Sequence, residues 1–153
     1  MPIEPTDAEL LSCCFAPSFA RAVAAGSPYR DAAELGDAAE KAVLALEWDE
    51  VLQALSAHPR IGERPQGEGR EAAWSRDEQS GVQESTRAAL AEGNRAYEER
   101  FGHVYLVCAS GLRGEELLAR LRTRLANDEE REHEVVRAEL ARIARLRAER
   151  LAG

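Results

Sequence analysis

The sequence shows no long apolar run, no basic run interleaved with aromatic residues and no signal-peptide pattern in its first residues, and each absence argues against a class of protein. No stretch approaches the roughly 20 consecutive apolar residues of a membrane-spanning helix, so we expect no membrane span. The net charge of −8 repels phosphate backbones, and no basic run is interleaved with aromatic residues, so we expect no nucleic-acid binding. The acidic start, MPIEPTDAEL, lacks the basic and apolar parts of a signal peptide, which predicts a cytoplasmic protein.

Cysteine is scarce as well, and three cysteines cannot form a complete disulfide framework. Cys13 and Cys14 are adjacent, and Cys108 stands far from both. An odd number of cysteines with two direct neighbours is typical of a protein from a reducing compartment. We therefore interpret all three as packing residues.

Histidine is equally rare, which bears on metal and cofactor binding. The chain has only His58, His103 and His133, and no two of them lie at the short spacings of zinc ligands. No Gly-rich loop joins a strand to a helix, so the phosphate and dinucleotide fingerprints are absent. The sequence therefore predicts neither a metal nor a bound cofactor.

The chain is instead rich in Ala, Leu, Glu and Arg, with apolar residues at three- and four-residue steps. This pattern predicts an all-α fold: one compact domain over residues 1–153, with about seven to nine helices and one long Gly/Pro-rich loop. The expected helices cover about residues 6–15, 19–23, 38–46, 49–57, 75–101, 114–125 and 129–151.

Two segments break the helical pattern. Residues 58–74, HPRIGERPQGEGREAAW, hold three glycines and two prolines, and a loop of this length in a small domain is usually functional or disordered. Residues 103–109, HVYLVCA, follow Gly102, a plausible helix stop, and form the one β-like run. With no second run to pair with, we interpret this segment as buried extended chain or a helix start.

His58 and Glu78 flank the long loop and are the candidates for acid/base chemistry. Each also has a purely structural interpretation. A histidine at a helix C-terminus interacts favourably with the helix dipole, and Ser75 with Glu78 forms a complete capping box. The residues alone leave both interpretations open.

Four motifs occur in an order that resembles the 2-oxo-4-hydroxy-4-carboxy-5-ureidoimidazoline (OHCU) decarboxylases. They are His58-Pro59-Arg60-Ile61-Gly62, Trp74-Ser75-x-x-Glu78-Gln79, Asn94-x-x-Tyr97-x-x-x-Phe101-Gly102 and Ile143-Ala144-Arg145-Leu146-Arg147. The resemblance implies an all-helical, cofactor-free enzyme of urate degradation, commonly a homodimer, that converts a small ureidoimidazoline to (S)-allantoin.

The resemblance also implies roles for individual residues. His58 is similar to the catalytic histidine of the family, with Glu78 assisting it. The residues that the resemblance places in contact with the substrate are Pro59, Ser75, Gln79, Leu106, Val107, Cys108, Ala109, Ser110 and Arg147.

Two alternatives remain open at this point. The chain could be a helical module without turnover that binds a purine breakdown product or a partner helix. It could also be an enzyme acting on a different ureidoimidazole, because His103 and Tyr105 stand where the family usually has phenylalanines.

Overall fold

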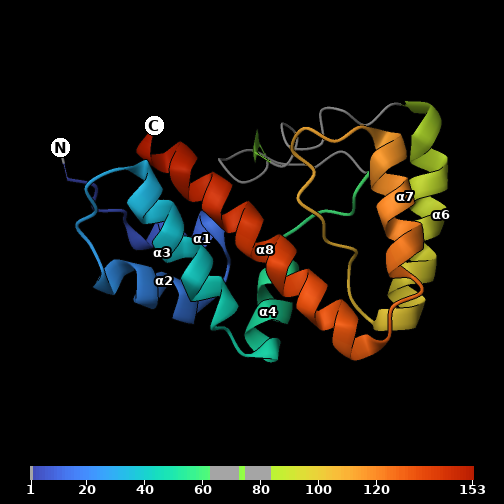
Figure 1. Ribbon diagram of the computed structural model, residues 1–153, viewed down its shortest axis with the longest axis horizontal. Coiled ribbons are helices and arrows are strands. Elements are labelled where there is room, and N and C mark those ends of the chain that lie inside the picture. Colours follow the sequence, from blue (N-terminus) through green and yellow to red (C-terminus); the bar gives the residue numbers. More distant parts are fainter. Residues whose placement is uncertain (1, 63–72, 75–83) are drawn as a thin grey trace. The chain divides into compact units, whose positions relative to one another are not determined.

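The computed structural model describes residues 2–62, 73–74 and 84–153, and within these ranges it has helices and no strand (Figure 1). The seven helices of the described ranges are α1 (Asp7–Cys13), α2 (Pro17–Ala25), α3 (Ala32–Leu44), α4 (Trp48–Leu55), α6 (Glu84–Phe101), α7 (Gly114–Arg124) and α8 (Glu129–Ala152). The predicted all-α fold and helix number are therefore confirmed. Most of the expected Gly/Pro-rich loop lies outside the described residues. None of the helices described is long and apolar enough to cross a membrane.

The chain forms two compact units. The first unit contains residues 1–57 and 137–153, and the second contains residues 58–136. α8 contributes its first eight residues to the second unit and the remainder to the first. The prediction of one domain over residues 1–153 concerns the chain as a whole, and it stays a prediction.

The helix starts of the first unit follow from local capping. Thr6 accepts a hydrogen bond from the Glu9 backbone N–H over 3.1 Å, and the Glu9 carboxylate accepts one from the Thr6 N–H over 2.9 Å. This capping box satisfies two backbone donors that have no helical partners at the start of the helix. Pro17 is the first residue of α2, where a missing N–H has no cost.

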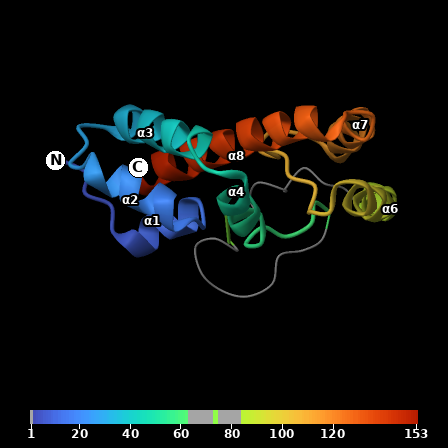
Figure 2. The same ribbon diagram turned by 90° about the horizontal axis from the view of Figure 1, so that it is seen from below.

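α3 begins six residues before the predicted start at Ala38. The Asp31 side chain accepts a hydrogen bond from the Glu34 N–H over 2.9 Å and so forms the N-cap. The sequence analysis missed this first part of the helix because it contains small residues, which contribute little to the apolar periodicity. Gly36 lies in it, where an added Cβ would come within 3.2 Å of Arg145 Cγ, so α3 packs closely on the last part of α8 (Figure 2).

In the second unit α6 and α7 lie side by side (Figures 1 and 2). Gly93 on α6 permits this approach, because a Cβ there would lie 2.0 Å from Leu121 Cδ2 on α7. α6 ends at Phe101, and the next residue, Gly102, has a φ of +80°, which confirms the predicted helix stop. α8 begins with Asp128 as its cap, since the Asp128 carboxylate accepts a hydrogen bond from the Arg131 N–H over 2.8 Å.

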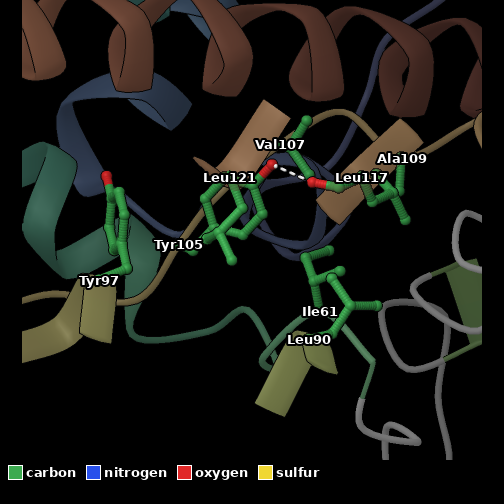
Figure 3. Close-up of a cluster of buried hydrophobic side chains, with 8 residues drawn as sticks. All are labelled: Ile61, Leu90, Tyr97, Tyr105, Val107, Ala109, Leu117 and Leu121. Carbon is green, nitrogen blue, oxygen red and sulfur yellow. Dashed lines mark hydrogen bonds between the residues drawn. The ribbon is translucent and has the colours of Figure 1, made fainter. Parts of the chain in front are cut away.

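The core of the second unit gathers side chains from α6, α7 and two non-helical segments (Figure 3). Its fully or almost fully buried members are Ile61, Leu90, Tyr97, Tyr105, Val107, Ala109, Leu117 and Leu121. Residues 105–109 are buried and form neither a helix nor a strand ladder. Of the two interpretations of residues 103–109, buried non-helical chain is therefore correct and a helix start is wrong.

Candidate functional site

His58 lies just after α4, at the beginning of the second unit. α4 ends at Leu55, two residues before the predicted end at Ala57, and His58 and Pro59 are both partly buried in a non-helical segment. His58 is thus three residues beyond the last helical residue rather than in the final turn, where the dipole interaction is strongest.

The chain that follows Pro59 is held against α6 by side chains of that helix. The Asn94 amide donates a hydrogen bond to the Ile61 carbonyl over 2.7 Å, and Arg87 donates one to the Gly62 carbonyl. Asn94 is only 1% exposed, so its bond to Ile61 is made away from water. The backbone carbonyls of Ile61 and Gly62, in the same motif as His58, therefore have fixed directions.

Further contacts hold the same segment. Arg60 forms a two-pronged ion pair with Glu98 on α6, with distances of 2.7 and 3.1 Å. Gly62 has a φ of +96°, and an added Cβ would lie 3.2 Å from Leu90 Cβ, so both its conformation and its surroundings favour glycine. The last three residues of the motif, Arg60, Ile61 and Gly62, thus dock on α6.

A hollow of about 460 Å³ opens beside this segment. Among the described residues it is lined by Arg60, Ala91, Asn94, Arg95, Glu98 and Glu99. None of these is a predicted site residue, so the hollow supplies no support for the predicted pocket.

The second predicted part of the site, residues 106–110, lies in the same unit as His58. Leu106, Val107, Cys108 and Ala109 are buried, and Ser110 is exposed. The buried cysteine agrees with its interpretation as a packing residue, as do the buried Cys13 and Cys14 in the first unit.

Side chains of two helices hold this buried segment. The Tyr105 hydroxyl donates a hydrogen bond to the Leu117 carbonyl over 3.0 Å (Figure 3). The Leu106 carbonyl accepts one from Arg124 over 2.5 Å. Arg124 in turn forms a buried ion pair with Glu132, which Tyr97 also contacts through its hydroxyl. Burial and the hydrogen bond to Glu132 both raise the pKa of Tyr97, so this side chain stays neutral.

His103 and Tyr105, where the family usually has phenylalanines, both lie against the ring of Tyr97. The ring centroids are 5.6 Å apart for His103 and 5.4 Å apart for Tyr105. Burial lowers the pKa of His103, and its backbone hydrogen bond to Val104 only partly opposes this. Both residues therefore pack as aromatic rings, which is also what phenylalanine would do.

The remaining predicted site residues lie outside the described ranges or in the first unit. Ser75, Glu78 and Gln79 lie outside the described residues, so the pairing of His58 with Glu78 stays a prediction. Arg147 belongs to the first unit, where it is fully buried and donates a hydrogen bond to the Ser12 carbonyl over 3.3 Å. Its role in substrate binding likewise stays a prediction. The described ranges contain no group of three or more potential metal ligands.

Arg124 and Glu132 were not identified by the sequence analysis. Arg124 is the last residue of α7 and Glu132 lies in the first turn of α8, where basic and acidic residues are ordinary partners of the helix dipole. Their eight-residue separation spans a turn and matches no spacing rule. Only the fold reveals that both are buried.

The comparisons with known proteins agree on one family. The model of the OHCU decarboxylase family matches residues 1–149. The uric acid degradation bifunctional protein TTL of Arabidopsis thaliana is 31% identical over 99% of this chain, which spans about half (48%) of that relative's length. The 2-oxo-4-hydroxy-4-carboxy-5-ureidoimidazoline decarboxylase of Amia calva is 29% identical over 86% of this chain and 78% of its own.

Solved structures agree with the sequence matches. The crystal structure of an OHCU decarboxylase in the presence of (S)-allantoin superposes with a TM-score of 0.80 at 30% identity, covering 96% of this chain and 98% of its own. An (S)-allantoin synthase shares the fold, with a TM-score of 0.65 at 18% identity over 93% of this chain and 48% of its own. Because the family model spans nearly the whole sequence, and motifs, fold and relatives agree with it, this chain belongs to the OHCU decarboxylase family.

Proposed function

We propose that this protein decarboxylates 2-oxo-4-hydroxy-4-carboxy-5-ureidoimidazoline to (S)-allantoin in urate degradation, without a cofactor. The match of residues 1–149 to the family model carries the proposal. The structural similarity to an OHCU decarboxylase crystallised in the presence of (S)-allantoin supports the choice of product.

The chemistry of the substrate explains why no cofactor is needed. One ring carbon carries a carboxylate and a hydroxyl, and it adjoins the imine carbon that bears the ureido group. When the bond to the carboxylate breaks, its electron pair moves toward the imine, carbon dioxide leaves and an enol remains. The substrate is its own electron sink, a role for which other decarboxylases recruit an organic cofactor.

Three side chains have roles in this proposal. His58 handles the proton of the hydroxyl group, because an imidazole ring can both take up and release a proton near neutral pH. Glu78 accepts hydrogen bonds from the ureido or ring N–H groups and relays a proton. Arg147 offers paired donors to a carbonyl or carboxylate of the substrate.

The backbone of residues 106–110, together with Pro59, Ser75 and Gln79, fixes the orientation of the ring. A fixed ring receives its new proton on one face, and that face determines the S configuration of the product. The hydrogen bonds that hold the Ile61 and Leu106 carbonyls support this role, because a stereospecific step requires segments with little freedom.

The competing proposal is a non-catalytic module that binds a purine breakdown product or a partner helix. The experiment that separates the two supplies freshly oxidised urate together with the hydrolase of the preceding step, and follows optical rotation. Rapid formation of dextrorotatory allantoin above the slow racemic background supports the decarboxylase. Background rates at micromolar protein would overturn the proposal and favour the binding module.

We also propose a cytoplasmic homodimer, as the family resemblance implies. Light scattering on the purified chain tests the dimer: a mass near twice 16.8 kDa supports it, and a mass near 16.8 kDa at working concentration contradicts it.

A further inference from the structure

The second unit buries an ionic cluster for which the proposed chemistry has no use. Arg124 is 6% exposed, and Glu132 and Tyr97 are fully buried. Moving two charges out of water has a large desolvation cost, which their attraction offsets only when the geometry is good and the remaining polar atoms are bonded. A buried ion pair is thus weak evidence for stability, and another function for this cluster is worth seeking.

The bonds of the cluster satisfy nearly every polar atom in it. Arg124 approaches one Glu132 oxygen with Nε at 2.8 Å and Nη2 at 2.5 Å, and the Tyr97 hydroxyl donates to the same oxygen. The other Glu132 oxygen accepts a hydrogen bond from the Asn127 amide over 3.0 Å. The guanidinium carbon of Arg124 also lies over two aromatic rings, 4.8 Å from the ring centroid of Tyr105 and 5.8 Å from that of Tyr97. The arginine therefore has one fixed orientation.

The remaining donor of this fixed arginine points at the predicted site. Arg124 Nη1 lies 2.5 Å from the carbonyl oxygen of Leu106, which belongs to a buried segment without a strand ladder. Because the peptide unit is planar and trans, the N–H of Val107 points opposite to the Leu106 carbonyl. Fixing the carbonyl therefore fixes the direction of the Val107 N–H as well.

We propose that Arg124, held by Glu132 and Tyr97, is a positioning residue that orients the Leu106–Val107 peptide for the substrate. The proposal rests on the proposed function, in which the backbone of residues 106–110 contacts the ring. Glu132 acts through Arg124, and Tyr97 acts through Glu132. None of the three touches the substrate, and each serves to aim a backbone group.

The test replaces the cluster by apolar side chains of similar size, in the variant Tyr97→Phe/Arg124→Met/Glu132→Leu. Such replacements of buried ion pairs often leave stability unchanged or raise it, so the variant separates folding from positioning. The matched control is Arg131→Met/Glu134→Leu, which removes an exposed Arg–Glu pair of 3.3 Å from the same end of α8. Each protein is assayed for (S)-allantoin formation and for amide hydrogen exchange in the peptide covering residues 103–110.

We expect the triple variant to fold, to exchange the amides of residues 106–109 at least about tenfold faster, and to lose at least about tenfold in kcat, since small misplacements of a site are costly. In the control variant, kcat and the amide exchange rates should stay within about twofold of those of the unaltered protein. A folded triple variant with unchanged kcat and unchanged exchange overturns the proposal.

If the triple variant does not fold, Arg124→Lys replaces it, because lysine keeps the charge opposite Glu132 but lacks the fork that reaches Leu106 at the same time. Normal exchange and kcat in Arg124→Lys then contradict the proposal. If the unaltered protein forms no (S)-allantoin, the proposed function fails, while the exchange measurement still decides whether the cluster orients this peptide.

Discussion

Each unit holds an arginine against carboxylates, and the surroundings of the two arginines differ. In the first unit Arg145 lies 2.6 Å from Asp37 and 2.8 Å from Glu40, and these acids keep 70% and 44% of their side-chain surface exposed. In the second unit Arg124 and Glu132 keep only 7% and 0%. Water screens the first cluster and is excluded from the second. Removing one charge from the second cluster is therefore expected to cost more unfolding free energy than removing one charge from the first.

The buried polar bonds of the second unit occur where the site is predicted. Asn94 fixes the chain after His58, and Arg124 fixes the chain at Leu106. A catalytic site needs geometry held to a fraction of an ångström, and buried hydrogen bonds provide it at non-helical segments. These bonds are thus what the predicted roles of His58 and of residues 106–110 would require.

The largest effect on stability is expected when one partner of the buried ion pair is removed and the other is left in place. Glu132→Ala leaves Arg124 buried without a carboxylate, which costs about 3–5 kcal/mol of unfolding free energy. Urea unfolding followed by circular dichroism measures the loss. The apolar triple variant serves as the control, because it removes both charges together. A loss below about 1 kcal/mol would show that water reaches the cluster, and the contrast between the units would disappear.

The next effect concerns activity rather than folding. His58→Ala is expected to lower kcat/KM at least about a hundredfold, because a positioned acid/base typically contributes about 10²- to 10⁴-fold. His58 is partly exposed in a non-helical segment, so the melting temperature should change little. Steady-state formation of (S)-allantoin and a thermal melt measure the two quantities. Near-normal turnover would remove His58 from the mechanism.

Glu78→Gln is the companion variant, since glutamine can still serve in a capping box but carries no charge. A folded and inactive protein is expected if Glu78 takes part in the chemistry. Full rate and full stability would assign Glu78 to the cap alone.

Much of the fold was predictable because helix signals are local. The helix start near Thr6, the stop at Gly102 and the apolar periodicity depend on residues within one or two turns, and the first helix and the stop were predicted correctly. The start of α3 was missed because Asp31 caps a run of small residues that lack an apolar stripe. Local signals therefore locate helices well and their ends less well.

The candidate site was predictable only in part. The motif from His58 to Gly62 and the segment 106–110 were recognised through the family resemblance. Nothing in the sequence reveals that Asn94 bonds to Ile61 or that Arg124 bonds to Leu106, because both contacts join residues far apart along the chain. Long-range polar contacts of this kind appear only when the helices are packed.

A smaller effect on stability is expected from removing a buried hydrogen bond between two uncharged groups. Asn94→Ala removes the donor to the Ile61 carbonyl, and an unsatisfied buried acceptor costs about 1–3 kcal/mol. The loss should fall in the lower part of this range, because the Asn94 carbonyl oxygen has no hydrogen-bond partner among the described residues, so its removal breaks no bond to them. Urea unfolding checks the value, with the exposed neighbour Arg95→Ala as control. Equal losses in the two variants would contradict the role of this bond.

A pH-dependent effect is expected from His103. Burial lowers its pKa below 6.5, so the folded protein keeps the ring neutral while the unfolded chain takes up a proton. The contribution of His103 to stability is therefore fully present above the unfolded pKa and decreases as the pH falls below it. His103→Phe should lose less unfolding free energy than the unaltered protein between pH 7.5 and 5.5. An identical decrease in both proteins, measured by urea unfolding, would show that His103 is accessible to water.

The smallest effect is expected at the exposed cluster of the first unit. Arg145→Ala removes ion pairs to Asp37 and Glu40 that water screens, so the unfolding free energy should change by less than about 1 kcal/mol. The difference from the unaltered protein should shrink further in 1 M salt, where the Debye length is about 3 Å. Arg145 also packs its side chain beside Gly36, so Arg145→Met is the control that keeps the packing and removes the charge. If Arg145→Met is destabilised as strongly as Glu132→Ala, burial does not make the Arg124–Glu132 pair more important for stability than the exposed cluster around Arg145. The comparison of the two clusters would then be wrong.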